Sequence, residues 1–235
     1  MCACDSDGRA VYVYRSSSGR LLGRVELKSA KKMEKRDVHA REFETTPDGS
    51  MLYALYPEAG LLELYGVAKG KRLFSKELAG FVPIDYSVGR NFNNDTLSLS
   101  CDAKRLLYAS GLMAVLIDID AGRVVFRLNR RGEKPGMERW DADTFASLSD
   151  SARFLALSRA MYGENVAADD TGHDEGRELT RTDRFEVWDM LKGKKVADFH
   201  TGGRISNIIA GVPDGTFTFG LSNGRICKLT LQNYV

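Results

Sequence analysis

Two clusters of basic side chains are the clearest candidates in this sequence for binding an anionic group. The first comprises Lys28, Lys31, Lys32, Lys35 and Arg36, and the second comprises Arg130, Arg131, Lys134 and Arg139. Closely spaced cations can hold an acidic partner or a phosphate. The alternative is loop charge that is only solvated. Neither cluster interleaves aromatic residues except near Trp140, so the pattern does not favour a nucleic-acid partner.

A second candidate is the acidic segment between residues 161 and 183. It contains Asp169, Asp170, His173, Asp174, Glu175 and Glu178. Carboxylates beside a histidine can bind a divalent cation, but this spacing does not match a calcium-binding loop. Three glycines and few apolar residues favour a flexible loop instead. The sequence therefore predicts no metal site.

Signatures of catalysis are missing from the sequence. It has no nucleophile elbow, no phosphate-binding loop and no zinc-protease motif. Its four cysteines, Cys2, Cys4, Cys101 and Cys227, lack the paired spacing of zinc ligands. We therefore predict no catalytic residue and no cofactor, and we expect reduced thiols in a cytoplasmic protein.

Composition is that of an ordinary soluble globular protein. The chain has 235 residues, of which 43% are hydrophobic and 28% are charged, with a net charge of +2. No apolar run approaches the roughly 20 residues that a membrane helix requires. The near balance of charge gives no general reason to expect a membrane or nucleic-acid partner.

An internal repeat defines the elements that must position these residues. The repeated unit contains a turn, two strands, a glycine turn and a third strand. Its first landmark is an aspartate at Asp48, Asp102, Asp150 and Asp214, and its second is a glycine at Gly19, Gly70, Gly122 and Gly193. Outside the 161–183 insertion the period is about 50 residues, close to that of propeller blades. Short runs of β-branched and aromatic residues between such turns predict antiparallel meanders that stack radially.

The third strand of the repeat also resembles that of a known family. Phe185-Glu-Val-Trp-Asp189 followed by Gly193 looks like the strand of a WD repeat that ends in Trp-Asp. Asp118-Ile-Asp120-Ala-Gly-Arg-Val-Val occupies the same place, and it is also similar to the repeats of bacterial lactonase-like propellers. The resemblance implies an all-β fold of four-stranded blades. It also implies that Trp188 is buried between neighbouring blades.

The strand count predicts a propeller that is incomplete. We expect one domain over residues 1–235, with an insertion at 161–183. Its blades are expected at residues 1–27, 38–78, 95–129, 143–200 and 204–231. This gives 18 strands in about four and a half to five blades, because the first blade lacks its inner strand and the last lacks its outer one. Such a chain is either a fragment of a larger propeller or an arc that another chain completes, and its open edges allow self-association.

The family's geometry places the long connections at residues 28–37, 79–94, 130–142 and 161–183 on one face. Binding residues are commonly carried by long loops on a rigid scaffold. The predicted interaction surface consists of Lys31, Lys32, Lys35, Arg36, Arg90, Asn91, Arg130, Arg131, Arg139, Trp140 and Arg204.

Three functions remain open at this point. The first is a non-catalytic scaffold that binds a protein or peptide through the loop-rich face. The second is a propeller enzyme of the lactonase-like or quinone-dependent class, in which polar residues line a central channel. The residues available for such a channel are Arg90, Asn91, Asn93, Asp141, Asp143 and Arg204. The third is a sensor or regulatory module of a larger multidomain protein.

Overall fold

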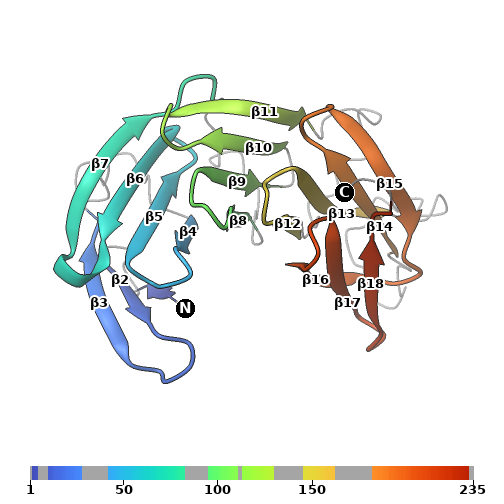
Figure 1. Ribbon diagram of the computed structural model, residues 1–235, viewed down its shortest axis with the longest axis horizontal. Coiled ribbons are helices and arrows are strands. Elements are labelled where there is room, and N and C mark those ends of the chain that lie inside the picture. The colour runs from blue at the N-terminus through green and yellow to red at the C-terminus, as the bar shows by residue number, and fades with distance from the viewer. Residues whose placement is uncertain are drawn as a thin grey trace, which may run out of the picture. The chain divides into compact units, whose positions relative to one another are not determined.

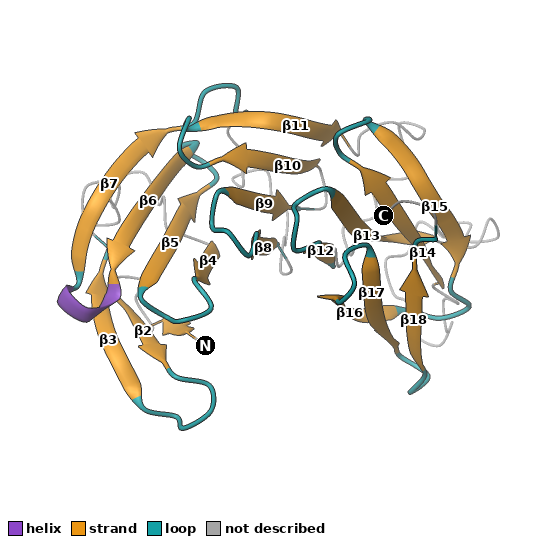
Figure 2. Cartoon of the chain, viewed as in Figure 1, coloured by secondary structure: helices purple, strands orange, loops and turns teal. Residues whose placement is uncertain are grey.

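The computed structural model describes residues 2–4, 10–27, 42–82, 95–110, 113–129, 145–161 and 182–232. The chain divides into two compact units, Met1–Lys134 and Pro135–Val235. Figure 1 shows the strands of each unit in chain order, and Figure 2 shows that strands and turns make up almost all of the described residues. The expectation of one domain over residues 1–235 stays a prediction.

The first unit contains three antiparallel sheets. Sheet 1 has the strands β1 (Cys2–Cys4), β2 (Ala10–Tyr14) and β3 (Leu21–Glu26). Sheet 2 has β4 (Glu42–Thr45), β5 (Met51–Tyr56), β6 (Leu61–Gly66) and β7 (Lys71–Glu77), with the short 3-10 helix η2 (Val67–Lys69) before its last strand. Sheet 3 has β8 (Thr96–Leu99), β9 (Arg105–Ala109), β10 (Met113–Asp118) and β11 (Arg123–Asn129).

The second unit contains two antiparallel sheets. Sheet 4 has β12 (Ala146–Leu148), β13 (Phe154–Met161), β14 (Thr182–Asp189) and β15 (Lys194–His200). Sheet 5 has β16 (Ile205–Gly211), β17 (Thr216–Leu221) and β18 (Ile226–Thr230). The described residues thus contain the 18 strands expected from the sequence, and sheets 1 and 5 have three strands each. The prediction of an all-β fold with four-stranded antiparallel blades is confirmed, and none of the described sheets closes into a barrel.

Each sheet buries alternate side chains against a neighbouring sheet of its own unit. Val11, Val13 and Val25 of sheet 1 pack against sheet 2 through Leu52 and Tyr65. The opposite face of sheet 2 packs against sheet 3, and sheets 4 and 5 share a third cluster of the same kind. Full burial of one such side chain stabilises the fold by about 1.5 to 3 kcal/mol. These inter-sheet cores explain why the meanders stack.

The turn before the outer strand depends on a glycine, as the repeat predicts. Gly70, Gly122 and Gly193 have φ of 58°, 64° and 60°, a region that residues with a Cβ avoid. At Gly70 space is also limiting, because a Cβ would lie 2.8 Å from the carbonyl oxygen of Arg24. The second landmark of the repeat therefore marks a real backbone requirement.

The predicted position of the first landmark of the repeat, the turn aspartate, is wrong by one residue in sheet 4. The positive φ of this turn falls on Gly49, Ala103 and Ala152, so the residue equivalent to Asp48 and Asp102 is Ser151 and not Asp150. The side-chain oxygens confirm this equivalence. Asp48 accepts the backbone N–H of Ser50 (3.0 Å), and Ser151 accepts that of Arg153 in the same way (3.2 Å). A hydroxyl can replace the carboxylate here because the turn needs only one acceptor two residues upstream.

The prediction that Trp188 is buried between blades is also wrong. Trp188 is half-buried, whereas Phe185 and Val187 on the other face of β14 are fully buried against sheet 5. The indole N–H donates to Glu186 Oε2 (3.1 Å), and the Lys195 ammonium lies 5.5 Å from the ring centroid. An indole with a polar partner and a cation over its face is stable at a partly exposed position.

Candidate interaction surface

Most of the predicted interaction surface lies outside the described residues. This applies to Lys31, Lys32, Lys35, Arg36, Arg90, Asn91, Arg130, Arg131, Arg139 and Trp140. It also applies to the acidic insertion between residues 162 and 181. Arg204 is the member of the predicted surface that the structure describes, and it is exposed.

The connection that carries Arg204 is held by a buried aspartate. Asp183, at the start of β14, is 0% exposed, and its Oδ2 accepts the N–H of Ile205 (2.7 Å). The Thr201 hydroxyl lies 2.7 Å from the carbonyl oxygen of Asp183 and 2.6 Å from that of Gly203, so its one hydrogen is shared between these two acceptors. Buried polar groups are stable only when they are paired in this way. The backbone of residues 201–205 is therefore a defined support for the Arg204 side chain.

The turn between β17 and β18 lies beside this connection. Ser222 donates its N–H to the carbonyl oxygen of Arg204 (2.8 Å). Within the turn, Asn223 accepts the N–H of Arg225 through its side chain (3.2 Å), and both residues are exposed. Two guanidinium-bearing residues, Arg204 and Arg225, thus come from two adjacent connections at one end of sheet 5. We call this pair, together with Asn223, the arginine end of sheet 5.

Guanidinium groups at an exposed sheet end suit recognition of carboxylates or phosphates. Arginine presents several N–H donors in a planar fork that matches both kinds of anion. Sequence reasoning found Arg204 but missed Arg225. The available signal was the hairpin Ser222-Asn-Gly-Arg225, since its tight turn must place Arg225 at the end of the sheet.

A buried charge network in sheet 2 was not predicted either. Glu63 is 0% exposed, and its Oε2 accepts the hydroxyls of Tyr65 (2.6 Å) and Tyr56 (3.0 Å). Its Oε1 accepts from Arg72 Nη1 (2.5 Å). Burial, followed by the Glu63 charge, raises the pKa of the Tyr56 phenol. The hydrogen bond to Glu63 is the main reason that the pKa of Arg72 is raised.

Sheet 4 repeats this network at equivalent positions. Glu186 is 5% exposed and accepts from Trp188 Nε1 and from Lys195 Nζ (2.9 Å). The segment Glu63-Leu-Tyr-Gly-Val-Ala-Lys-Gly-Lys-Arg72 aligns without gaps with Glu186-Val-Trp-Asp-Met-Leu-Lys-Gly-Lys-Lys195. That alignment is the sequence signal that could have found both networks. Sheet 3 has Val115 and Val124 in the places of the glutamate and the cation.

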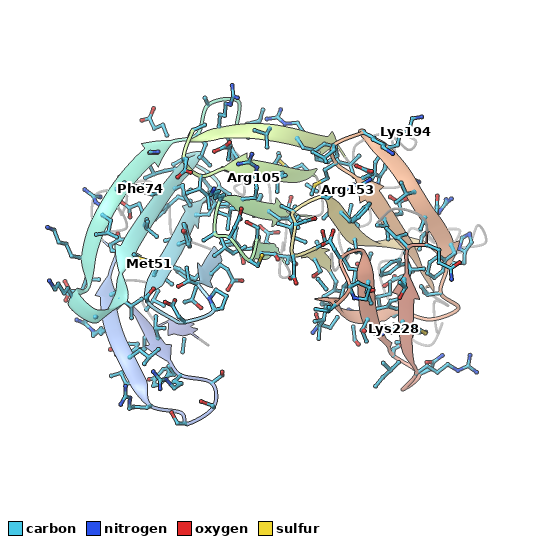
Figure 3. All side chains as sticks on the ribbon, in the orientation of Figure 1. Met51, Phe74, Arg105, Arg153, Lys194 and Lys228 are labelled. Atoms are coloured by element: carbon cyan, nitrogen blue, oxygen red, sulfur yellow. The ribbon has the colours of Figure 1, made fainter. Side chains whose placement is uncertain are left out.

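The aspartate of the WD-like dipeptide has a structural role. Asp189 is 0% exposed, and it accepts the N–H groups of Leu191 (3.1 Å) and Lys192 (3.2 Å). Asp189 also forms an ion pair with Arg153 (3.1 Å). Figure 3 labels Arg153 on the ribbon. In sheet 3, Asp118 likewise caps a turn and pairs with Arg105, and the Ala121 N–H is the main reason that the pKa of Asp118 is lowered. These carboxylates hold turns and are not placed for an exposed binding site.

Metal-binding and membrane-spanning features are both missing from the described residues. The described part of the chain has no group of three or more His, Cys, Asp or Glu residues placed to hold a metal ion. Nor does any described helix have the length and apolar character needed to cross a membrane.

Comparisons with known proteins support the fold. The sequence matches no protein-family model and no curated protein. Among solved structures, hydrazine synthase of Kuenenia stuttgartiensis is similar with a TM-score of 0.57 at 14% identity, over 97% of this chain and 60% of that chain. U3-55K has a TM-score of 0.45 at 12% identity, over 80% of this chain and 50% of that chain.

A third similar structure is a chain of the mitotic checkpoint complex. It has a TM-score of 0.44 at 15% identity, over 94% of this chain and 71% of that chain. The chain thus spans 50% of U3-55K and 60% of the hydrazine synthase chain. At these identities the likeness concerns the fold alone, and the hydrazine synthase comparison supports the all-β blade architecture.

Proposed function

We propose that this chain is a non-catalytic scaffold of the WD-repeat-like propeller type that binds a protein or peptide. The observation that carries the proposal is the arginine end of sheet 5. There a backbone hydrogen bond from Ser222 to Arg204 places Arg204 beside the turn that carries Arg225. Side chains on two such connections, supported by the packed core between sheets 4 and 5, are suited to bind acidic groups of a partner.

The test is binding of an acidic peptide to the whole chain and to charge-reversed variants. The probe is a fluorescein-labelled seven-residue peptide that contains three glutamates, and the measurement is fluorescence anisotropy at low salt. Arg204→Glu with Arg225→Glu should weaken binding at least tenfold, since each reversal turns an attraction into a repulsion. Lys71→Glu with Lys194→Glu is the control, because it changes the net charge by the same amount at two exposed cations. Lys194 is an exposed cation at the start of β15, whereas the Arg204 connection follows the end of that strand (Figure 3).

Equal weakening by the control and by the arginine double variant would contradict the proposal, because it would show general charge attraction. Unchanged binding by the arginine double variant would contradict it as well. Circular dichroism of each variant checks that the fold is retained.

A further inference from the structure

Sheet 5 is one strand shorter than its neighbour in the same unit. In sheet 4 the third strand, β14, pairs with β13 on one side and with the outer strand β15 on the other. In sheet 5 the third strand, β18, pairs with β17, and the described residues provide no strand on its other side. The edge of β18 is therefore where a fourth strand would pair.

The backbone of β18 directs hydrogen-bonding groups toward this edge. Arg225 accepts from the Leu221 N–H (2.8 Å), and Leu231 donates to the Gly215 carbonyl (3.1 Å), so the odd-numbered residues face inward. Because the pattern alternates along a strand, the N–H and C=O groups of Ile226, Lys228 and Thr230 face outward. All three residues are exposed, and the side chain of Lys228 projects from β18 in Figure 3. Such a row of outward groups is a template for another strand.

Side chains at this edge show what a fourth strand would cover. Cys227 and Leu229 face the core between sheets 4 and 5 but are only half-buried. Glu63 and Tyr65, at the equivalent positions of sheet 2, are each 0% exposed beneath the outer strand β7. The apolar surface of Cys227 and Leu229 is thus left partly open, because among the described residues no outer strand pairs with β18.

The four-stranded sheets also indicate the chemistry of a strand that would pair with β18. In sheets 2 and 4 the buried glutamate is matched by a cation on the outer strand, and in sheet 3 Val115 is matched by Val124. Cys227 and Leu229 therefore require apolar partners, while Lys228 on the opposite face favours a carboxylate. An outer strand runs antiparallel to its neighbour, so its C-terminal end would lie beside Arg225, where β18 begins. Acidic residues at that end would meet the arginine end of sheet 5.

We propose that β18 binds an extended segment of a partner protein, which adds to sheet 5 as its fourth strand. The segment alternates apolar and polar residues and ends in acidic residues at its C-terminal side. The proposal rests on the proposed function, because it names how the partner of the arginine end is held. Main-chain hydrogen bonds supply the affinity, and the alternating side chains supply the specificity.

The test uses the whole chain and two labelled peptides of identical composition. The first, Thr-Val-Glu-Val-Thr-Glu-Glu, has the alternating pattern, and the second, Val-Val-Thr-Glu-Glu-Glu-Thr, does not. Binding is followed by anisotropy, and the backbone amides of Ile226, Lys228 and Thr230 are followed by hydrogen exchange. The first peptide should bind at least tenfold more tightly than the second and should slow exchange at all three amides.

Two variants of Lys228 distinguish the contribution of the backbone edge to binding from the contribution of the side-chain charge. Lys228→Pro removes one outward N–H while leaving the inward hydrogen bonds of β18, as proline on an edge strand allows. Lys228→Ala removes only the charge. The proline variant should lose at least tenfold in affinity for the first peptide, and the alanine variant should lose less. If the proline variant does not fold, the amide exchange of the unaltered chain still tests whether the peptide adds to β18 as a strand.

Each other outcome has a distinct meaning. Equal binding of both peptides without amide protection overturns strand addition but leaves the acidic-partner function standing. No binding of either peptide overturns both proposals. Protection of the three amides without peptide, increasing with protein concentration, overturns the peptide partner because a second copy of this chain then occupies the edge.

Discussion

At the scale of single residues, two buried glutamates of the described strands are each matched by a cation on the adjacent outer strand. Glu63 is paired with Arg72, Glu186 is paired with Lys195, and sheet 3 has valine at both positions. A buried carboxylate without its cation is strongly unfavourable, whereas an apolar pair of similar size can be equally stable. The two positions of each couple therefore change together from sheet to sheet.

This coupling predicts a non-additive result for Glu63 and Arg72. Each single variant, Glu63→Val or Arg72→Val, should destabilise the fold by about 2 to 4 kcal/mol, since it leaves one charge without its partner. The double variant reproduces the couple of sheet 3 and should cost at least about 1 kcal/mol less than the sum. Urea unfolding of the four proteins measures the coupling. Strict additivity would show that the two side chains do not depend on one another.

For Glu44 we predict the opposite effect, namely that removing the charge of a buried carboxyl group stabilises the fold at neutral pH. Burial raises the pKa of its carboxyl group, and the Thr45 N–H donates to its Oε1 (2.9 Å). A carboxyl whose pKa is raised by folding contributes stability below its unfolded pKa of about 4.3, and this contribution is lost as pH rises through the folded value. Glu44→Gln keeps the acceptor and removes the charge. It should therefore raise the urea midpoint at pH 7 and leave it nearly unchanged at pH 4.

At the scale of strands, sheet 5 has a register that its turn sequence does not reveal. Pro213-Asp-Gly215 aligns with Pro47-Asp-Gly49, which would place Phe217 in the position of Met51, on the face toward the following sheet. The structure instead packs Phe217 against sheet 4. Residues 212–215 link the paired ends of β16 and β17, whereas residues 46–51 link those of β4 and β5. A shift of one residue moves every side chain of a strand to the other face.

This register predicts opposite outcomes for neighbouring substitutions in β17. Phe219 is buried, and its ring stacks on Phe185 with centroids 4.4 Å apart. Phe219→Ala should cost about 3 to 5 kcal/mol, while Thr218→Ala on the other face should change stability by less than about 0.5 kcal/mol. Thermal unfolding of both variants provides the measurement. Comparable losses at the two positions would mean that the register is different.

Comparison of the predicted elements with the observed ones shows which features local sequence could predict. Strand positions and turn glycines were predictable because alternation and positive φ are properties of a few adjacent residues. The turn residue of sheet 4 was predicted to be Asp150, although it is Ser151, because two side-chain acceptors lie side by side in the sequence. Trp188 was misplaced, and the register of Phe217 was not predicted, because the face of a strand depends on pairing with other strands. The arginine end was only half-found, since Arg225 reaches Arg204 through a turn that the repeat alone does not position.

At the scale of the whole chain, sheets 1 and 5 differ in the face that each turns away from the neighbouring sheet of its own unit. On sheet 1 the face away from sheet 2 carries Tyr12, Arg24 and Glu26, and Arg24 is paired with Glu26 (2.7 Å). On sheet 5 the face away from sheet 4 carries Thr218 and Lys228, together with exposed isoleucines. The outward face of sheet 1 is thus polar, whereas that of sheet 5 also exposes Ile209 (59%) and Ile226 (80%). Apolar side chains are therefore accessible on this face of sheet 5 as well as at the edge of β18.

Acid should weaken the fold through aspartates that hold turns in several sheets. Hydrogen bonds from Thr46 and Ser50 lower the pKa of Asp48, and hydrogen bonds from Ser100 and Lys104 lower that of Asp102. The pKa of Asp118 is lowered by the Ala121 N–H and by Arg105. A carboxyl whose pKa is lowered by folding contributes stability above its unfolded value of about 3.9, and this contribution is lost as pH falls through the folded value.

The urea midpoint of the unaltered chain should therefore fall below about pH 4. The triple variant Asp48→Asn, Asp102→Asn, Asp118→Asn keeps a side-chain acceptor at each turn but removes the titration. It should be less stable than the unaltered chain at pH 7 and should show a shallower decline between about pH 4 and pH 2.5. Parallel pH profiles of the triple variant and the unaltered chain would show that other carboxylates govern acid unfolding.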